Sequence, residues 1–257
     1  MSTKDFLKKI KDEDIEWVDV RFTEKRGKPQ KETIVSDLVD EDFVEEGFMF
    51  DGSSIAGWKS IEASDMKLML DTDTAYVDPF YAEKTICVHC SVVEPDTGEA
   101  YERDPRGTAQ KAEAYLKASG IGDVAYMGPE AEFFLFDNVK FSNSINKVSY
   151  EVDASDASWN TDTDYEMGNM GHRPGLKGGY FPVNPTDEAQ DLRAEMLSTM
   201  KRLGMKVDKH HHEVASCQHE LGLIFGTLTE QADELQKYKY VIHNVAHAYG
   251  KSATFMP

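Results

Sequence analysis

Cysteine is scarce in this chain of 257 residues. Its three cysteines, Cys87, Cys90 and Cys217, cannot all pair with one another, and three are too few for the disulfide framework of a secreted scaffold. Long apolar runs are also lacking, because no stretch approaches the roughly 18 residues that a membrane-spanning helix needs, and Met1–Trp17 has no apolar signal core. We therefore expect a cytoplasmic protein that does not enter a membrane.

Positive charge is scarce as well. The chain has 28 Lys and Arg residues against 47 Asp and Glu residues, a formal net charge of −19 and a sequence pI near 4.8. No basic run is longer than a pair such as Lys8–Lys9. A strongly acidic protein repels nucleic acid and anionic membranes, so neither is expected as the main partner. The 40% of hydrophobic residues suffices for the core of one large or two ordinary domains.

The first hundred residues contain short stretches of alternating apolar and polar residues, a pattern typical of strands. A helix capped by Ser2 or Thr3 is predicted to precede them, with Phe6, Leu7 and Ile10 on its apolar side. The predicted strands cover residues 17–23, 32–35, 48–50, 67–70, 75–77 and 85–93. Together these elements predict a small sheet domain with one or two helices.

Cys87 and Cys90 fall on the last of these strands, in the C-x-x-C spacing of some zinc and redox sites. Side chains on a strand alternate between its faces, so an odd offset directs the two sulfur atoms to opposite faces. We therefore expect two small buried side chains here rather than a metal or redox site.

A domain boundary is predicted near Asp104. This residue suits an N-cap, Pro105 suits the first position of a helix, and Gly120 is placed to end that helix. Residues 1–103 and 104–257 are therefore expected to form two domains.

The second part of the chain mixes polar loops with longer helices. Residues 142–179 are rich in Asp, Ser, Asn and Gly and are predicted to form long loops. One helix is predicted over Asp187–Leu203, with Asp187 in a capping box, and another over Thr229–Tyr249, ended by Gly250.

Two glutamates open the apolar run Phe133–Phe136. A turn at Gly128–Pro129 precedes them, and the Phe and Leu residues after them favour a strand. On a strand, Glu130 and Glu132 project to one side, where adjacent carboxylates repel each other unless a cation lies between them. Carboxylate oxygens are the ligands that Mg²⁺ and Mn²⁺ prefer. The segment is therefore either part of a divalent metal site or a solvated strand end.

A second acidic cluster lies within His210–Glu220. Its residue types suggest a strand that bends and continues, and a bend would bring Glu213 and Glu220 onto one wall. With the two earlier glutamates, this would place four carboxylates on one sheet, too much negative charge to bury without a metal. Three successive histidines suggest zinc as an alternative. Alternation allows at most two of them on one face, so we interpret them as packing groups around the site.

Four motifs, in the same order, resemble those of the type I glutamine synthetases of bacteria and archaea. They are Phe50–Ser54 (FDGSS), Gly128–Phe133 (GPEAEF), Gly179–Pro182 (GYFP) and His211–Ala215 (HHEVA). The resemblance covers essentially the whole chain. It implies an α+β fold, in which a small β-grasp-like domain precedes the start of a catalytic domain with a curved antiparallel sheet and flanking helices.

The resemblance implies an ATP-dependent ligase that makes glutamine from glutamate and ammonia through a γ-glutamyl phosphate. Phosphoryl transfer depends on positioning and on neutralising phosphate oxygens, which paired Mg²⁺ or Mn²⁺ ions supply. By this resemblance, Glu132, Glu213 and Glu220 hold one metal ion, and Glu130 helps to hold a second.

The resemblance also implies roles for two aspartates. Asp51 matches an ammonium-binding aspartate, whose carboxylate attracts NH₄⁺ and accepts its proton. Without the resemblance, Asp51 would be interpreted as a turn-stabilising residue. Asp208 stands where the family usually has a glutamate near the nucleotide. Family members form dodecamers of two rings, in which Asp51 of one subunit completes the site of its neighbour.

The sequence departs from the family pattern in two ways. Ser216–Cys217 stand where many relatives have a glycine before the glutamine, and a cysteine close to a metal site is a candidate for oxidation. The sequence also stops before the family's glycine-rich ATP loop, metal-binding histidine, glutamate-binding arginines and flap glutamate. We therefore expect a truncated portion that does not make glutamine alone.

Two other functions are weighed against this one. A changed ammonium site would favour a ligase that joins glutamate to a larger amine, and the intact Asp51–Ser54 disfavours it. A non-enzymatic relative that acts in assembly or regulation would be expected to lose its metal carboxylates, whereas all four glutamates are present.

Overall fold

The computed structural model describes residues 1–160, 166 and 171–256. The chain divides into two compact units, and neither is one continuous stretch of sequence. The first unit comprises Met1–Met127 and Gly226–Gln236, and the second comprises Gly128–Phe225 and Lys237–Pro257. None of the described helices is long and apolar enough to cross a membrane.

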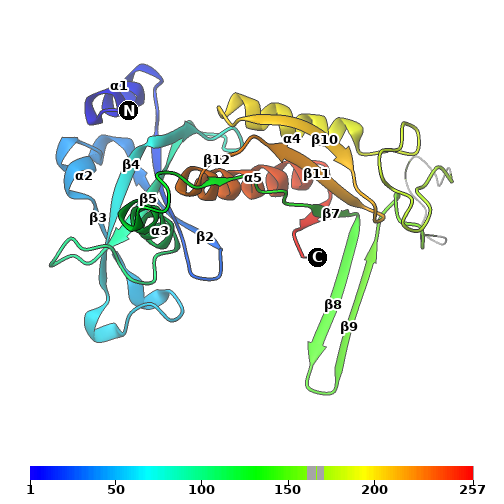
Figure 1. Ribbon diagram of the computed structural model, residues 1–257, viewed down its shortest axis with the longest axis horizontal. Coiled ribbons are helices and arrows are strands. Elements are labelled where there is room, and N and C mark those ends of the chain that lie inside the picture. The colour runs from blue at the N-terminus through cyan, green and yellow to red at the C-terminus, as the bar shows by residue number, and fades with distance from the viewer. Residues whose placement is uncertain (161–165, 167–170, 257) are drawn as a thin grey trace. The chain divides into compact units, whose positions relative to one another are not determined.

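The first unit is built on a five-stranded sheet with the strand order β2-β1-β5-β4-β3 (Figure 1). β1 runs parallel to β5, and the other neighbouring strands are antiparallel. The strands are β1 (Trp17–Thr23), β2 (Pro29–Val35), β3 (Phe48–Asp51), β4 (Asp65–Val77) and β5 (Thr85–Val93). The helices that accompany them are α1 (Thr3–Asp12), α2 (Glu41–Glu46) and the short 3-10 helices η1 (Ser36–Leu38), η2 (Gly52–Ser54) and η3 (Ile61–Ala63).

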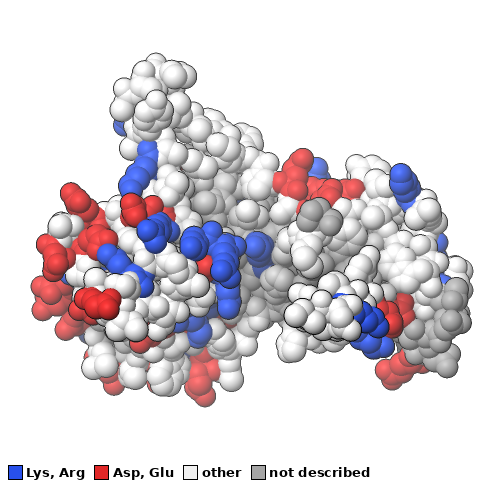
Figure 2. All heavy atoms as spheres, turned by 90° about the horizontal axis from the view of Figure 1, so that it is seen from below, with Lys and Arg blue, Asp and Glu red and all other residues white. Residues whose placement is uncertain are grey.

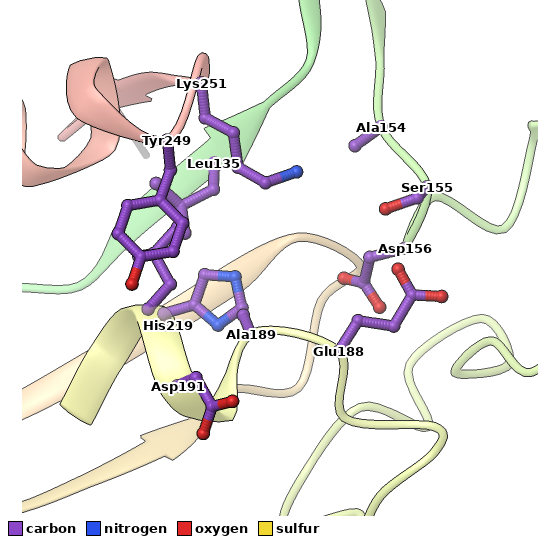
Figure 3. A pocket seen from close by; sticks show the side chains of 11 residues that line it. Leu135, Ala154, Ser155, Asp156, Glu188, Ala189, Asp191, His219, Tyr249 and Lys251 are labelled. Atoms are coloured by element: carbon purple, nitrogen blue, oxygen red, sulfur yellow. The ribbon is translucent and has the colours of Figure 1, made fainter. Parts of the chain in front are cut away.

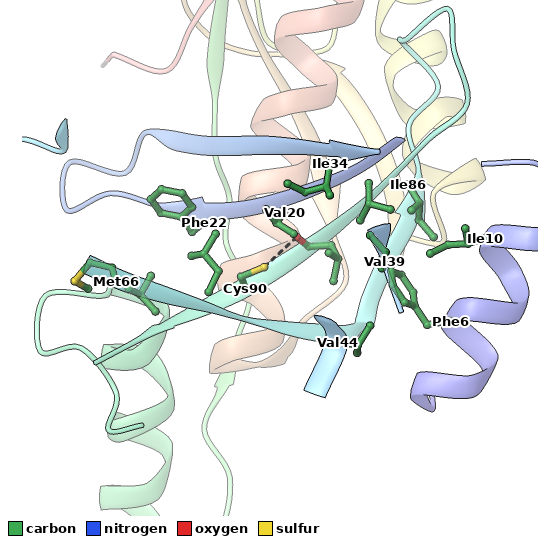
Figure 4. Close-up of a cluster of buried hydrophobic side chains, with 14 of the residues drawn as sticks. Phe6, Ile10, Val20, Phe22, Ile34, Val39, Val44, Met66, Ile86 and Cys90 are labelled. Carbon is green, nitrogen blue, oxygen red and sulfur yellow. Dashed lines mark hydrogen bonds between the residues drawn. The ribbon is translucent and has the colours of Figure 1, made fainter. Parts of the chain in front are cut away.

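The core of this unit contains apolar side chains from the sheet and from α1. Phe6 and Ile10 of α1 join the same buried cluster as Ile86 and Cys90 of β5 (Figure 4). The Cys87 thiol lies on the other face of β5, where its Sγ is 3.5 Å from Asp78 Oδ2. The prediction of two buried cysteines on opposite faces is therefore confirmed.

β4 is one long strand, whereas the sequence predicted two short strands at 67–70 and 75–77. Its pairing with β5 shifts register between Asp71 and Tyr76. Such an irregularity lets a strand accommodate extra residues without ending. The polar run Asp71–Thr74 therefore marks the register shift and not a break between strands.

The helix α3 (Pro105–Ser119) has the predicted ends. The Asp104 carboxylate accepts hydrogen bonds from the N–H groups of Arg106 and Gly107 at 3.2 and 3.1 Å, and Gly120 has the left-handed φ of 71° that ends the helix. The prediction for α5 (Leu228–Ala248) is confirmed, with each end shifted slightly. The two-residue strands β6 (Tyr126–Met127) and β12 (Gly226–Thr227) pair with each other.

The second unit contains a four-stranded antiparallel sheet with the order β10-β11-β7-β13. Its strands are β7 (Phe133–Phe136), β10 (Val207–His212), β11 (Gln218–Leu223) and β13 (Ser252–Thr254), and α4 (Gln190–Arg202) lies against β10. The predicted capping box at Asp187 is wrong. The N-cap of α4 is Ala189, whose methyl group cannot cap a helix, and Asp187 instead forms a buried ion pair with Arg193.

β8 (Asn138–Ser144) and β9 (Lys147–Asp153) form an antiparallel hairpin that projects from this sheet (Figure 1). The prediction of loops is therefore wrong over residues 142–144 and 147–153, which form strands. Most side chains of the hairpin are exposed, including Phe141 and Tyr150, so its sequence lacks the alternation that a half-buried strand requires. Residues 161–165 and 167–170 of the predicted loop region lie outside the described residues.

On one face of the molecule, the charged side chains lie in several separate groups (Figure 2). On the face shown in Figure 2, clusters of Asp and Glu side chains alternate with clusters of Lys and Arg. The net charge of −19 therefore does not gather into one continuous acidic patch on this face.

Candidate functional site

β10 and β11 form a hairpin, and Glu213–Cys217 make the turn between them. His211 lies opposite Glu220 in the ladder, and His212 lies opposite His219. The sequence predicted a strand that bends and continues, so that prediction is wrong. Cys217 has a left-handed φ of 64°, which allows the chain to reverse. The reversal nevertheless brings Glu213 and Glu220 together, as the sequence predicted.

The side chains of His211, Glu213 and Glu220 form a compact cluster at the end of this hairpin. Each offers one possible ligand atom, and these atoms all lie within 4.8 Å of one another. His211 Nδ1 is 3.2 Å from Glu213 Oε1, and His211 Nε2 is 3.7 Å from Glu220 Oε2. Burial raises the pKa of Glu220, and the charges of Glu213 and Glu130 add to this effect while His211 opposes it.

This cluster has the donor set of a divalent cation site. His211 Nδ1 is buried and makes no hydrogen bond with any described residue. Two carboxylates lie beside it, and their crowding is unfavourable unless positive charge compensates it. Carboxylate oxygens with one imidazole nitrogen suit Mg²⁺ or Mn²⁺. The residues present therefore fit such an ion.

Glu130 and Glu132 lie in the segment just before β7, whereas the sequence placed them on the strand itself. The carbonyl of Ala131 accepts a hydrogen bond from the Tyr238 hydroxyl at 2.7 Å, so a side chain takes the place of a strand partner there. Both glutamates are exposed. The side-chain amide of Gln218, at the start of β11, donates a hydrogen bond to Glu132 Oε2. Glu132 is thus tied to the strand that carries Glu220.

The segment Gly179–Pro182 packs against the same turn. The Gly179 N–H donates to the Val214 carbonyl at 3.1 Å, and a Cβ on Gly179 would lie 2.4 Å from the Glu213 carbonyl oxygen. Only glycine fits so close an approach. The rings of Tyr180 and Phe181 meet the His211 ring edge-on, with centroids 5.8 and 4.9 Å away.

A buried network lies behind the turn. His212 Nε2 is 2.9 Å from Asp156 Oδ2, and the same oxygen accepts a hydrogen bond from the Cys217 N–H. Burial alone would lower the pKa of His212, but the hydrogen bond to Asp156, the negative charge of Asp156 and the hydrogen bond to the Glu213 carbonyl together outweigh burial and raise the pKa. Burial and the charge of Arg193 lower the pKa of His219 well below its usual range, so this ring is neutral.

A cavity of about 300 Å³ adjoins this network (Figure 3). Asp156 and His219 line it together with Glu188, Tyr249 and Lys251. The Lys251 ammonium forms an ion pair with Asp137 at the end of β7. None of the residues that line this cavity belongs to the cluster of His211, Glu213 and Glu220.

Cys217 is fully buried beside Ala154 and Ala157. Burial raises the pKa of its thiol, so the reactive thiolate is disfavoured. The structure therefore does not support an oxidation-sensitive role for Cys217.

The two aspartates that the sequence singled out are exposed. Asp51, in the first unit, accepts hydrogen bonds from the N–H and the hydroxyl of Ser53 at 2.8 and 2.7 Å, and these hydrogen bonds lower the pKa of its carboxyl. Asp208 lies on β10. Its carboxylate packs so closely against Gly222 that a Cβ on residue 222 would lie 2.0 Å from Asp208 Oδ1.

Comparison with known protein families decides which family these features belong to. The model of the glutamine synthetase β-grasp domain matches residues 14–95, and the model of the glutamine synthetase catalytic domain matches residues 102–257. The chain belongs to the glutamine synthetase family. The resemblance seen in the four motifs is therefore confirmed, as is the predicted α+β fold of a β-grasp domain followed by catalytic-domain elements.

Individual relatives agree with this assignment. The chain is 75% identical to a glutamine synthetase of Cereibacter sphaeroides over 98% of its own length and 54% of the relative's, and 73% identical to one of Rhodobacter capsulatus over 100% and 58%. The solved glutamine synthetase of Plasmodium falciparum superposes with a TM-score of 0.91 at 26% identity, covering 100% of this chain and 50% of that one. This chain thus spans about half the length of the glutamine synthetases that it matches.

Some residues of this candidate site were not singled out from the sequence. Asp156 lies in a polar stretch that was interpreted as loop, and no local signal marked it. His211 was interpreted as a packing group around the site, and its ring lies between Glu213 and Glu220. The adjacent HHEVA motif was the available signal.

Proposed function

We propose that this chain carries metal-binding carboxylates of an ATP-dependent glutamate–ammonia ligase, which makes glutamine from glutamate and ammonia. The observation that carries this proposal is the convergence of His211, Glu213 and Glu220 within 4.8 Å in a member of the glutamine synthetase family. The two bacterial relatives named above, at 75% and 73% identity, bear the name glutamine synthetase.

The proposed cofactors are two Mg²⁺ or Mn²⁺ ions per complete site. Glu132, Glu213 and Glu220 would hold one ion, with His211 beside it, and Glu130 would contribute to the second. Bound divalent ions neutralise the phosphate oxygens of ATP during phosphoryl transfer. Gln218 orients Glu132 by donating a hydrogen bond to its carboxylate.

The remaining proposed roles concern residues that bind the substrates. Hydrogen bonds from Ser53 hold the pKa of Asp51 low, so its carboxylate is ionised at neutral pH and can attract ammonium and accept its proton. Asp208 is proposed to lie near the nucleotide. The complete enzyme is proposed to be a cytoplasmic homododecamer, and the sequence domains are proposed to divide at 103/104.

A calorimetric titration with Mn²⁺ tests this function directly. We expect the chain to bind Mn²⁺, and we expect Glu213→Gln and Glu220→Gln each to weaken the affinity at least about tenfold, a loss of about 1.4 kcal/mol. Glu151→Gln, on the exposed β9 strand, is the control and should leave the affinity unchanged. Equal affinities for all four proteins would contradict the proposed site.

A further inference from the structure

We propose that Asp156 is a positioning residue for the cation site, which it serves by fixing the Glu213–Cys217 turn from behind. The inference rests on the proposed function, because it concerns how Glu213 is presented to the metal. Asp156 itself does not belong to the His211, Glu213 and Glu220 cluster. It acts through His212, the residue before the turn, and through Cys217, the last residue of the turn.

One carboxylate oxygen of Asp156 contacts residues at both ends of the turn. Asp156 Oδ2 accepts from the N–H of Cys217, where the turn closes, and lies 2.9 Å from Nε2 of His212, just before the turn opens. The other ring nitrogen of His212 lies 2.6 Å from the backbone carbonyl of Glu213. Asp156 therefore fixes the backbone on both sides of Glu213.

The turn needs this support because of its backbone geometry. Cys217 has a φ of 64°, a left-handed conformation that is strained for a residue with a side chain. The hydrogen bond from the Cys217 N–H to Asp156 holds the residue in that conformation. Within the turn, Glu213 Oε2 accepts from the Val214 N–H at 3.1 Å, so the carboxylate orientation depends on the turn backbone.

Asp156 is itself held in place. It is buried, with an exposed fraction of 9%. The N–H of the preceding residue, Ser155, donates to Asp137 Oδ2 at 2.8 Å, and Asp137 is paired with Lys251. Through Ser155 and Asp137, Asp156 is thus linked to the end of β7 and to Lys251, which lies between α5 and β13.

A second cation site at Asp156 is the competing interpretation. Possible ligand atoms of Asp156, His212 and His219 also lie within 4.8 Å of one another. Both ring nitrogens of His212 already face oxygen atoms, and His219 Nδ1 is 3.1 Å from Arg193 Nη1, which can only donate. These contacts occupy both ring nitrogens of His212 and Nδ1 of His219, so His212 has no ring nitrogen left for a metal ion and instead supports the turn.

Mn²⁺ affinity measured by calorimetry on the whole chain tests the proposal. Asp156→Ala removes both hydrogen bonds and should weaken Mn²⁺ binding by about 10–100-fold, the usual effect of losing a group that orients a ligand. Asp156→Asn leaves an oxygen that can accept from the Cys217 N–H and should stay within about threefold of the parent. Asp191→Ala, an exposed acid on the same cavity, controls for the loss of negative charge and should change nothing.

Hydrogen exchange of the Cys217 amide, measured without metal, gives a second readout. The amide should be protected in the parent and in Asp156→Asn and should exchange freely in Asp156→Ala. If Asp156→Ala does not fold, Asp156→Ser replaces it, because the shorter hydroxyl cannot reach both donors.

Parent-like Mn²⁺ affinity in Asp156→Ala, or in Asp156→Ser where that variant replaces it, would overturn the proposal. So would a loss in Asp191→Ala as large as the loss in Asp156→Ala. Failure of the proposed function is distinguishable, because then the parent would not bind Mn²⁺ or Glu213→Gln would bind it equally well. The exchange of the Cys217 amide would still report whether Asp156 fixes the turn.

Discussion

The backbone φ angle of one residue, Cys217, allows the chain to reverse between the two strands of the β10–β11 hairpin. The sequence drew attention to Ser216–Cys217, because many relatives have a glycine there. The structure gives the physical reason, since φ is 64° at Cys217 and glycine adopts that angle without a steric cost. The fully buried Cys217 side chain packs beside Ala154 and Ala157, which offsets part of the strain.

Substitutions at Cys217 separate strain from packing. Both Cys217→Gly and Cys217→Ala remove the thiol, but only glycine relieves the left-handed strain. We expect Cys217→Gly to be more stable than Cys217→Ala by about 1 kcal/mol, the reverse of the usual order of these residues. Urea unfolding of the two variants provides the comparison. An alanine variant as stable as the glycine variant would show that residue 217 is not strained.

At the scale of elements, local signals predicted those helices and strands whose ends are marked by single residues. α3 begins after Asp104 and ends before Gly120, as the sequence indicated, and β1 and β5 also have the predicted bounds. The β10–β11 hairpin was missed because its turn depends on Asp156, which lies far away in the sequence. The convergence of Glu213 and Glu220 was predicted, whereas the positions of His211 and Asp156 were not, because both depend on tertiary contacts.

The cap of α3 is expected to contribute strongly to the stability of the first unit. Besides capping the helix, the buried Asp104 carboxylate accepts a hydrogen bond from the Val92 N–H of β5 at 3.0 Å. Asp104→Ala removes the cap and leaves that N–H unpaired, so it should cost about 2–4 kcal/mol. Asp104→Asn keeps an acceptor oxygen and should cost less than the alanine substitution.

Chemical denaturation measures both costs at Asp104. Asp96→Ala, an exposed loop substitution, is the control and should be neutral. A loss below about 0.5 kcal/mol in Asp104→Ala, the size typical of ordinary surface substitutions, would disprove the role of this cap.

At the scale of the whole molecule, the first unit depends on a segment that comes late in the chain. The buried Arg106 guanidinium donates to both carboxylate oxygens of Asp233, at 3.0 and 2.9 Å. His89 lies 3.5 Å from the same carboxylate, and Asp71 also pairs with Arg106. Burial alone would raise the pKa of Asp233, but the hydrogen bonds from His89 and Arg106, together with the positive charges of these residues, outweigh burial and lower the pKa.

This lowered pKa predicts an acid-sensitive contribution to stability. A carboxyl group whose pKa is lower in the folded than in the unfolded state stabilises the fold above its unfolded pKa, about 3.9, and the contribution disappears as the pH falls through the folded pKa. Asp233→Asn should therefore destabilise the first unit by about 3 kcal/mol at pH 7, because it leaves the buried guanidinium without its full partner. The difference from the parent should shrink as the pH falls below about 4.

Hydrogen exchange of the β5 amides at pH 7, 5 and 3 reports the stability of the first unit alone. The difference in stability between the parent and Asp233→Asn removes the pH-dependent contributions of other groups. Asp104 is one such group, because burial raises its pKa. A difference that is the same at all three pH values would show that ionised Asp233 is not the stabilising form.

The separation of Arg106 from Asp233 also governs when the first unit can be completed during synthesis. The two residues are 127 positions apart, so a ribosome that adds about 5–20 residues per second needs roughly 6–25 s to travel between them. During that interval the residues of β5 and α3 have been made, and Arg106 has Asp71 as a partner, but the Asp233 carboxylate has not yet been made. The first unit therefore cannot finish folding until the segment that carries Asp233 has been made.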